Sequence, residues 1–258
     1  MGQVLGADYG ATVLNQDIYE ISATQKHRLG TRVVRGDKVY HYAKTLTSIT
    51  NSQLAVWSYY HQSILYAAIA VASPVGDNHL YVTVAATDGI ADDGVIAAHA
   101  LEGGSVVLFD ASTDEWLNYT ILDNNAAVSG GTVTLTIEGT LPYATTTSDH
   151  VEVMASPWLV SSGNNGGLRP CWGPPMRLAT TTYPYFWIQT WGPCWLAPQS
   201  AVGATAHKNE VVFRHDGSID LPVYNDAYTM NAQRAGFVMT RAQDGSQGAP
   251  FIFLQVAA

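Results

Sequence analysis

The chain has 258 residues, a formal net charge of −9 and only 13% charged side chains, about half the fraction of an average soluble domain. A chain of this length can bury a core without help from metals or disulfides, and two cysteines exclude a disulfide-rich scaffold. The basic residues form no extended face of the kind that phosphate contacts need. We therefore expect no nucleic-acid partner.

The sequence carries no signal for secretion or membrane insertion. Its first residues lack a basic segment followed by an apolar core, so we expect no signal peptide. The longest apolar run, residues 64–72, is about half of what a membrane span requires. These features predict a soluble protein that is made in a cytoplasm and has no membrane partner.

Residues 1–30 show little strand pattern and predict an extended N-terminal arm that becomes ordered against another surface. The first strands are expected at 31–34 and 38–44, because the Gly36-Asp37 pair between alternating flanks signals a hairpin. Together with Arg35 this pair spells an integrin-recognition tripeptide, but the chemistry of a tight turn already accounts for it. Residues 45–75 fit either a short helix or a buried strand.

From residue 79 onward, short apolar-polar alternations separated by Gly, Asn and Asp turns predict β-strands. They lie at 80–86, 105–110, 116–122, 132–138, 151–154, 210–214, 236–240 and 250–256. Residues 155–200 are rich in Pro and Trp, and there only 185–191 is predicted as a strand. We therefore predict an all-β fold, an antiparallel β-barrel or sandwich, with an N-terminal arm (1–30), a β-rich domain (31–258) and a Pro/Trp-rich insertion (about 155–200). The patterns leave open whether the domain is one barrel or two lobes.

Motifs that carry chemistry are scarce. The eight histidines are scattered without metal-ligand spacing, and no phosphate-binding loop, dinucleotide fingerprint or nucleophile elbow occurs. We therefore expect no metal, no cofactor and no enzymatic activity, although the carboxylate pairs of glycosidases depend on distances in space and stay open. Cys171 and Cys194 lie in near-mirror motifs and could pair, but two buried thiols are favoured in a protein made in a cytoplasm.

Five of the seven tryptophans fall between residues 158 and 195. Aromatic side chains there could fill a core, anchor a protein interface or stack on sugar rings. The aromatic cluster that we single out consists of Trp172, Phe186, Trp187, Trp191 and Trp195. A surface with so little charge favours association, which suits a subunit that is covered by its neighbours.

Four blocks of the sequence resemble structural proteins encoded in the head modules of tailed bacteriophages. The first is the hairpin block 25–44 (QKHRLGTRVVRGDKVYHYAK), and the most distinctive is the aromatic string 185–194 (YFWIQTWGPC). The pair 104–110 and 116–121, and the closing strands 234–239 and 251–254, are similar to further parts of the same pattern. Together the blocks cover most of residues 25–256. The bulky aromatics at 55–72 and the motif that begins at Cys171 depart from the pattern.

The resemblance implies a virion structural protein, a capsid cement or decoration protein on the exterior of the head. Such proteins are similar in being β-rich, often trimeric, and seated where capsomers meet, so the implied partners are the major capsid protein and further copies of the chain. We expect the arm and first hairpin to make the capsid or subunit contact through Lys26, His27, Arg28, Arg32, Arg35, Tyr40 and Tyr42. The alternative is a head fibre or adsorption protein that binds host glycan through the Trp-rich region.

Overall fold

The computed structural model describes residues 15–59, 62–112, 115–163, 169–199, 202–203, 209–222, 232–239 and 251–257. These residues form eighteen β-strands and no helix. The predicted all-β fold is therefore confirmed. A helix with the length and apolar character of a membrane span is absent from the same residues.

The chain divides into two compact units. Unit 1 combines Met1–Tyr59 with Trp158–Ala258, and unit 2 is Tyr60–Pro157. Unit 2 therefore interrupts the sequence of unit 1 between two short strands, β3 (Val56–Ser58) and β12 (Leu159–Ser161).

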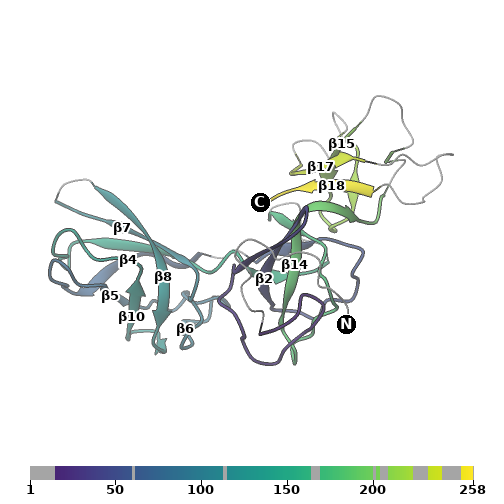
Figure 1. The fold of residues 1–258 in the computed structure, drawn as a ribbon. Helices are drawn as coiled ribbons and strands as arrows, with labels where there is room; N and C mark the ends of the chain where they lie inside the picture. The colour runs from purple at the N-terminus through teal and green to yellow at the C-terminus, as the bar shows by residue number, and fades with distance from the viewer. Residues whose placement is uncertain are drawn as a thin grey trace. The chain divides into compact units, whose positions relative to one another are not determined.

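Unit 2 is built around a closed barrel with the strand order β10-β5-β4-β11-β7-β8, part of which is labelled in Figure 1. All neighbouring strands in it are antiparallel. A two-stranded ribbon of β6 and β9 completes the unit. The strand bounds are β4 (Gln62–Val71), β5 (His79–Thr83), β6 (Val95–Ile96), β7 (Ser105–Phe109), β8 (Trp116–Asn124), β9 (Ala127–Val128), β10 (Thr132–Ile137) and β11 (His150–Met154).

The period-two pattern decides which side of each barrel strand faces inward. In β10, Val133, Leu135 and Ile137 are fully buried, whereas the threonines between them are at least partly exposed. The same alternation in β5, β7 and β11 joins these side chains into one apolar core. Each fully buried aliphatic side chain contributes about 1.5–3 kcal/mol, so the barrel has a core of its own.

Unit 1 contains a ten-stranded sheet with the order β13-β3-β12-β2-β14-β18-β17-β15-β16, and β1 pairs with β2. The remaining bounds are β1 (Arg32–Arg35), β2 (Lys38–Thr45), β13 (Cys171–Gly173), β14 (Tyr185–Trp195), β15 (Glu210–Phe213), β16 (Ile219–Asp220), β17 (Arg234–Val238) and β18 (Phe251–Gln255). Figure 1 shows β2 and β14 side by side, and they pair along most of β2.

The Pro/Trp-rich segment supplies three strands of this sheet, β12, β13 and β14. The strand predicted at 185–191 is confirmed as β14, which continues to Trp195 and is paired on both edges, with β2 and β18. The chain that follows β13 also pairs with β14: the Met176 N–H donates to the Trp187 carbonyl at 2.9 Å, and the Gln189 N–H to that of Pro174 at 3.1 Å. The part of the sheet from β13 to β14 therefore closes on itself, because the chain after β13 returns to pair with β14.

The predicted first hairpin is confirmed as β1 and β2, with Arg35 opposite Lys38. Gly36 in its turn has a φ of +58°, a conformation that glycine adopts without strain. The turn also rests on β14, because a Cβ added to Gly192 would lie 2.1 Å from the carbonyl oxygen of Asp37. Glycine at position 192 is therefore what lets the hairpin approach the central strand.

The described part of the expected N-terminal arm, residues 15–30, lies against unit 1 of its own chain. Ile18 is buried in one cluster with Tyr40, Tyr42 and Trp187. Ser22 forms an isolated antiparallel bridge with Tyr185 at the start of β14. These residues belong to the packed structure of unit 1, and the rest of the expected arm, residues 1–14, lies outside the described residues.

Candidate interaction surfaces

Three of the cations predicted to make a capsid or subunit contact lie on the surface of unit 1. Lys26, Arg28 and Arg32 are exposed, and their side chains have no ion-pair partner among the described residues. Arg35 is less exposed and pairs with Asp17 at 3.3 Å. We refer to Lys26, Arg28 and Arg32 as the cationic segment.

Buried groups beneath the cationic segment hold it in place. The Lys26 N–H donates to the hydroxyl of Tyr42 at 3.1 Å, and that hydroxyl donates to Gln16 Oε1 at 2.7 Å. Trp187 adds a hydrogen bond from Nε1 to the carbonyl oxygen of Gln16 at 3.2 Å. The ring of His27 lies 5.2 Å from that of Tyr42 and 5.3 Å from that of Trp187.

Tyr40 and Tyr42, which we expected at the contact surface, are instead buried, with 2% and 0% of their surface exposed. Strand β2 is covered on both faces, so its aromatic residues fill the interior whichever way they point. Burial raises the pKa of each phenol to about 12, since the charged form is poorly solvated there. The pKa of His27 is lowered for the same reason. Tyr40 and Tyr42 therefore lie in the interior beneath the cationic segment, and His27, which is half-buried, packs on Tyr42 and Trp187.

The five residues of the predicted aromatic cluster do not come together at one site. Phe186 and Trp187 are fully buried, in two different clusters. Trp191 packs edge-on against Phe253 of β18, with ring centroids 5.7 Å apart. Trp172 is half-buried and packs on the Phe186 cluster, and Trp195 is also half-buried. Most of this aromatic surface therefore serves the interior of unit 1.

A stack of three rings crosses the middle of unit 1. His41 stacks on Trp158 at 4.3 Å and 9°, and Trp158 stacks on Trp172 at 4.5 Å and 22°. The hydroxyl of Thr190 donates to the carbonyl oxygen of Ala257, so Nδ1 of His41, 2.9 Å away, is the donor to Thr190 Oγ1. Burial, followed by the charge of Arg32, lowers the pKa of His41 to about 4. The imidazole is therefore neutral at physiological pH.

The two units carry charges of opposite sign. Residues 60–157 contain twelve Asp and Glu and no Lys or Arg, which gives unit 2 a formal charge of −12. The whole chain carries 12 basic and 21 acidic side chains, so unit 1 keeps 12 basic and 9 acidic ones, a charge of +3. Six of the basic residues lie between positions 26 and 44.

A row of aromatic rings crosses four adjacent barrel strands on the outside of unit 2. Tyr66 of β4 stacks on His150 of β11, with centroids 4.4 Å apart and planes at 11°. Phe109 of β7 is paired in register with both His150 and Trp116 of β8. Its ring lies 5.4 Å from that of Tyr66 and 5.8 Å from that of Trp116. We refer to Tyr66, His150, Phe109 and Trp116 as the aromatic row.

Carboxylates border the aromatic row. Glu152 lies two residues beyond His150 on β11, and Glu115 directly precedes Trp116. Because residues two apart on a strand share a face, Glu152 adds a negative charge to the face that carries His150.

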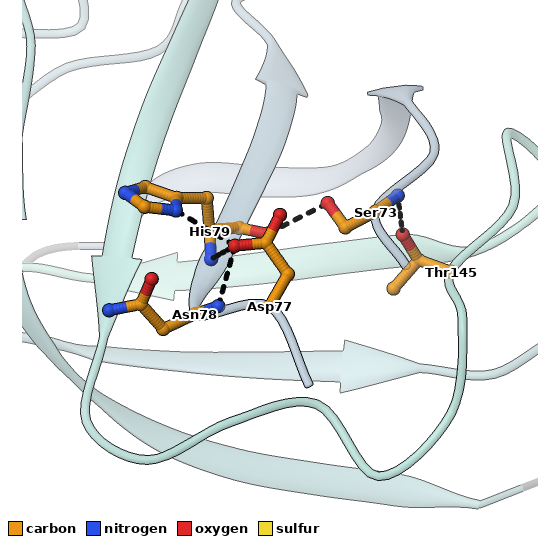
Figure 2. Close-up of polar contacts among 5 residues, drawn as sticks. All are labelled: Ser73, Asp77, Asn78, His79 and Thr145. Carbon is orange, nitrogen blue, oxygen red and sulfur yellow. Dashed lines mark hydrogen bonds and ion pairs between the residues drawn. The ribbon is translucent and has the colours of Figure 1, made fainter. Parts of the chain in front are cut away.

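Unit 2 also contains an Asp-His pair, shown in Figure 2. Asp77 Oδ1 lies 2.9 Å from Nδ1 of His79 and accepts hydrogen bonds from the backbone N–H groups of Asn78 and His79. These bonds lower the pKa of Asp77. The nearby Ser73 donates its hydroxyl to the carbonyl oxygen of His79 and so is not aligned with the imidazole. The arrangement closes a turn and does not form a nucleophile–base pair.

The remaining reactive groups in the described residues are two thiols that lie in one hydrophobic cluster. Cys171 and Cys194 are buried free thiols, as favoured from the sequence, and burial raises the pKa of each to about 12. No group of three or more His, Cys, Asp or Glu within the described ranges could hold a metal ion. A pocket of about 170 Å³ in unit 2, lined by Val95, Ile96 and Leu101 among others, offers mainly hydrophobic contact.

Two features of these surfaces were missed by sequence reasoning. The absence of Lys and Arg from positions 45–168 is visible in the sequence and could have indicated a unit of separate character. The aromatic row had no local signal, because its members are far apart in sequence and only the strand register joins them. Comparison of the chain with protein-family models, with curated proteins and with solved structures gives no match.

Proposed function

We propose that this chain is a virion structural protein, a cement or decoration protein that binds the outer surface of a tailed-phage head and strengthens contacts between its subunits. The observation that carries the proposal is the pairing, in one chain, of a unit with charge −12 and a unit with charge +3. A protein that joins two different neighbours can do so through two surfaces of different chemistry. Opposite charges on two such surfaces fix the register of each contact and determine which partner binds.

The character of the exposed groups supports this role. The cationic segment lies on β1 and the chain that leads into it, is exposed, and lacks ion-pair partners in the described part of the chain. It is therefore available to acidic surfaces of neighbouring subunits. On an icosahedral lattice many such contacts act together, so each can be weak while the layer as a whole stays bound. The low fraction of charged residues, 13%, suits a subunit whose surfaces are largely covered.

The alternative of a glycan-binding adsorption protein was based on the Trp-rich region. Trp187 and Phe186 from that region are fully buried, and Trp172 is taken up in a ring stack. We therefore retain the cement role as the proposal.

The direct test is the copy number of this chain in purified particles relative to the main shell protein. A fixed ratio that matches lattice positions would support the proposal, and absence from particles would refute it. A second test adds purified chain to shells that lack it. Arg28→Glu should reduce occupancy, whereas Arg177→Glu, which reverses an exposed cation outside the cationic segment, should not.

A further inference from the structure

The outer surface of the unit 2 barrel carries a local distortion that exposes two large apolar side chains. Between Val151 and Val153 of β11 the register with β4 shifts by one residue, which places Leu65 and Tyr66 together opposite Glu152. Both are exposed, Leu65 to 68% and Tyr66 to 57%. A regular strand would have turned one of them into the core.

Tyr66 also adopts a backbone conformation that is unfavourable for its residue type. Its φ is +44°, in a region that costs a residue with a Cβ about 1–2 kcal/mol. Strain of this kind persists only where the surrounding structure imposes it, and it is concentrated at functional sites. Here its result is that the ring of Tyr66 stacks on His150 and extends the aromatic row to a fourth strand.

The composition of this surface indicates the chemistry of its ligand. Neighbouring strands are about 4.8 Å apart, so the row spans about 14 Å across four strands. Trp116 at one end is 70% exposed. Glu152 and Glu115 beside the row have no ion-pair partner among the described residues. Aromatic faces next to carboxylates bind guanidinium and ammonium groups, through cation–π attraction and charge pairing together.

The geometry points to a second copy of this chain as the occupant: we propose that the aromatic row and Glu152 of one copy bind the cationic segment of another. Half of the basic residues of the chain lie between positions 26 and 44, and the cationic segment has no ion-pair partner within the described residues. Unit 2 has no Lys or Arg that could neutralise its own face. The two surfaces are therefore complementary in charge.

A contact between two different surfaces of the same chain is head-to-tail, and it continues from copy to copy unless rotation closes a ring. Such a contact can link copies across a shell. The inference rests on the proposed function and adds to it one specific contact between copies. It predicts weak, salt-sensitive association in solution, because exposed cation–π pairs are individually weak and screening removes the charge attraction.

Sedimentation velocity tests the inference. The full chain is measured over a range of concentrations up to about 1 mM, at about 0.05 M and at about 0.5 M NaCl. We expect concentration-dependent association at low salt that weakens at high salt. Trp116→Ala and Arg28→Glu should each weaken association about fivefold or more. Tyr183→Ala and Arg177→Glu, matched changes at exposed positions elsewhere, should leave it unchanged. Unaltered thermal unfolding of each variant would show that it is folded.

A charge exchange makes the test specific to the pair of surfaces. Glu152→Lys and Arg28→Glu should each impair self-association, and an equimolar mixture of the two variants should associate again. A chain that stays monomeric throughout, or association that is indifferent to Trp116→Ala, would overturn the inference. So would Trp116-dependent binding of a neutral chitin or cellulose oligosaccharide without self-association, which would assign the face to glycan. None of these results alters the copy number in particles, so failure of the inference is distinct from failure of the proposed function.

Discussion

Acidification should destabilise this protein through the buried residue His41. His41 has 6% of its surface exposed, its ring stacks on Trp158 and donates to Thr190 Oγ1, and its pKa is lowered from 6.5 to about 4. In the unfolded chain the imidazole takes up a proton near pH 6.5, whereas in the folded chain it does so only near pH 4. The unfolded state therefore binds more protons between these values, and stability falls as the pH is lowered through that window.

The size of the effect follows from the shift. The two pKa values differ by 6.5 − 4 = 2.5, and one pKa unit corresponds to about 1.4 kcal/mol, so the full loss is about 3 kcal/mol. Between pH 7 and pH 5 about 2 kcal/mol of this is expected. His27, whose pKa is also lowered, acts in the same direction, so a comparison with a variant is needed to isolate His41.

Urea unfolding at pH 7 and pH 5 measures this contribution. His41→Phe retains a ring that can stack on Trp158 but cannot take up a proton. We expect the wild-type chain to lose about 2 kcal/mol more than the variant between the two pH values. Equal losses in both proteins would show that His41 is not held neutral by burial, and the reasoning would fail.

Three further experiments test hydrogen bonding, close packing and backbone strain in the two units. Tyr42→Phe leaves the Lys26 N–H and Gln16 Oε1 without their partner, which should cost about 1–3 kcal/mol in chemical denaturation; a loss below about 0.5 kcal/mol would contradict this role. Gly192→Ala, at a φ of +92° and with a Cβ 2.1 Å from the Asp37 carbonyl oxygen, should lower the unfolding free energy by clearly more than Gly36→Ala, which has open space around it. Tyr66→Gly should be about 1 kcal/mol more stable than Tyr66→Ala by thermal unfolding, because both lose the ring and only glycine is relieved of the unfavourable φ; equal stabilities would argue against strain there.

Much of the strand content could be predicted because local patterns determine it. The Gly36-Asp37 turn, the alternation in β10 and the aromatic string of β14 each correspond to a strand or hairpin in the structure. The ambiguous stretch 45–75 contains β3 and the whole of β4. In β4, repeated register shifts against neighbouring strands disturb the period-two pattern.

The candidate surfaces were harder to predict because they depend on burial and register. Tyr40 and Tyr42 alternate like residues on one face of an exposed hairpin, but β2 is covered on both faces. No sequence pattern distinguishes these two situations, because both have the same period. Tyr66 and Trp116 are fifty residues apart in sequence, and only the pairing of β4, β11, β7 and β8 brings them into one row.

The way unit 2 is spliced into the chain has a consequence for engineering. The two strands of unit 1 on either side of the splice, β3 and β12, pair directly, with Ser58 opposite Val160. Within the barrel, Gln62 at its beginning is likewise opposite Met154 near its end. The two points where the chain passes between the units are thus neighbours within unit 1 and within unit 2. Under this condition an inserted domain can be exchanged without distorting the domain that carries it. An enzyme or antigen with adjacent termini could replace residues 60–157 and be displayed on a scaffold that keeps its own core.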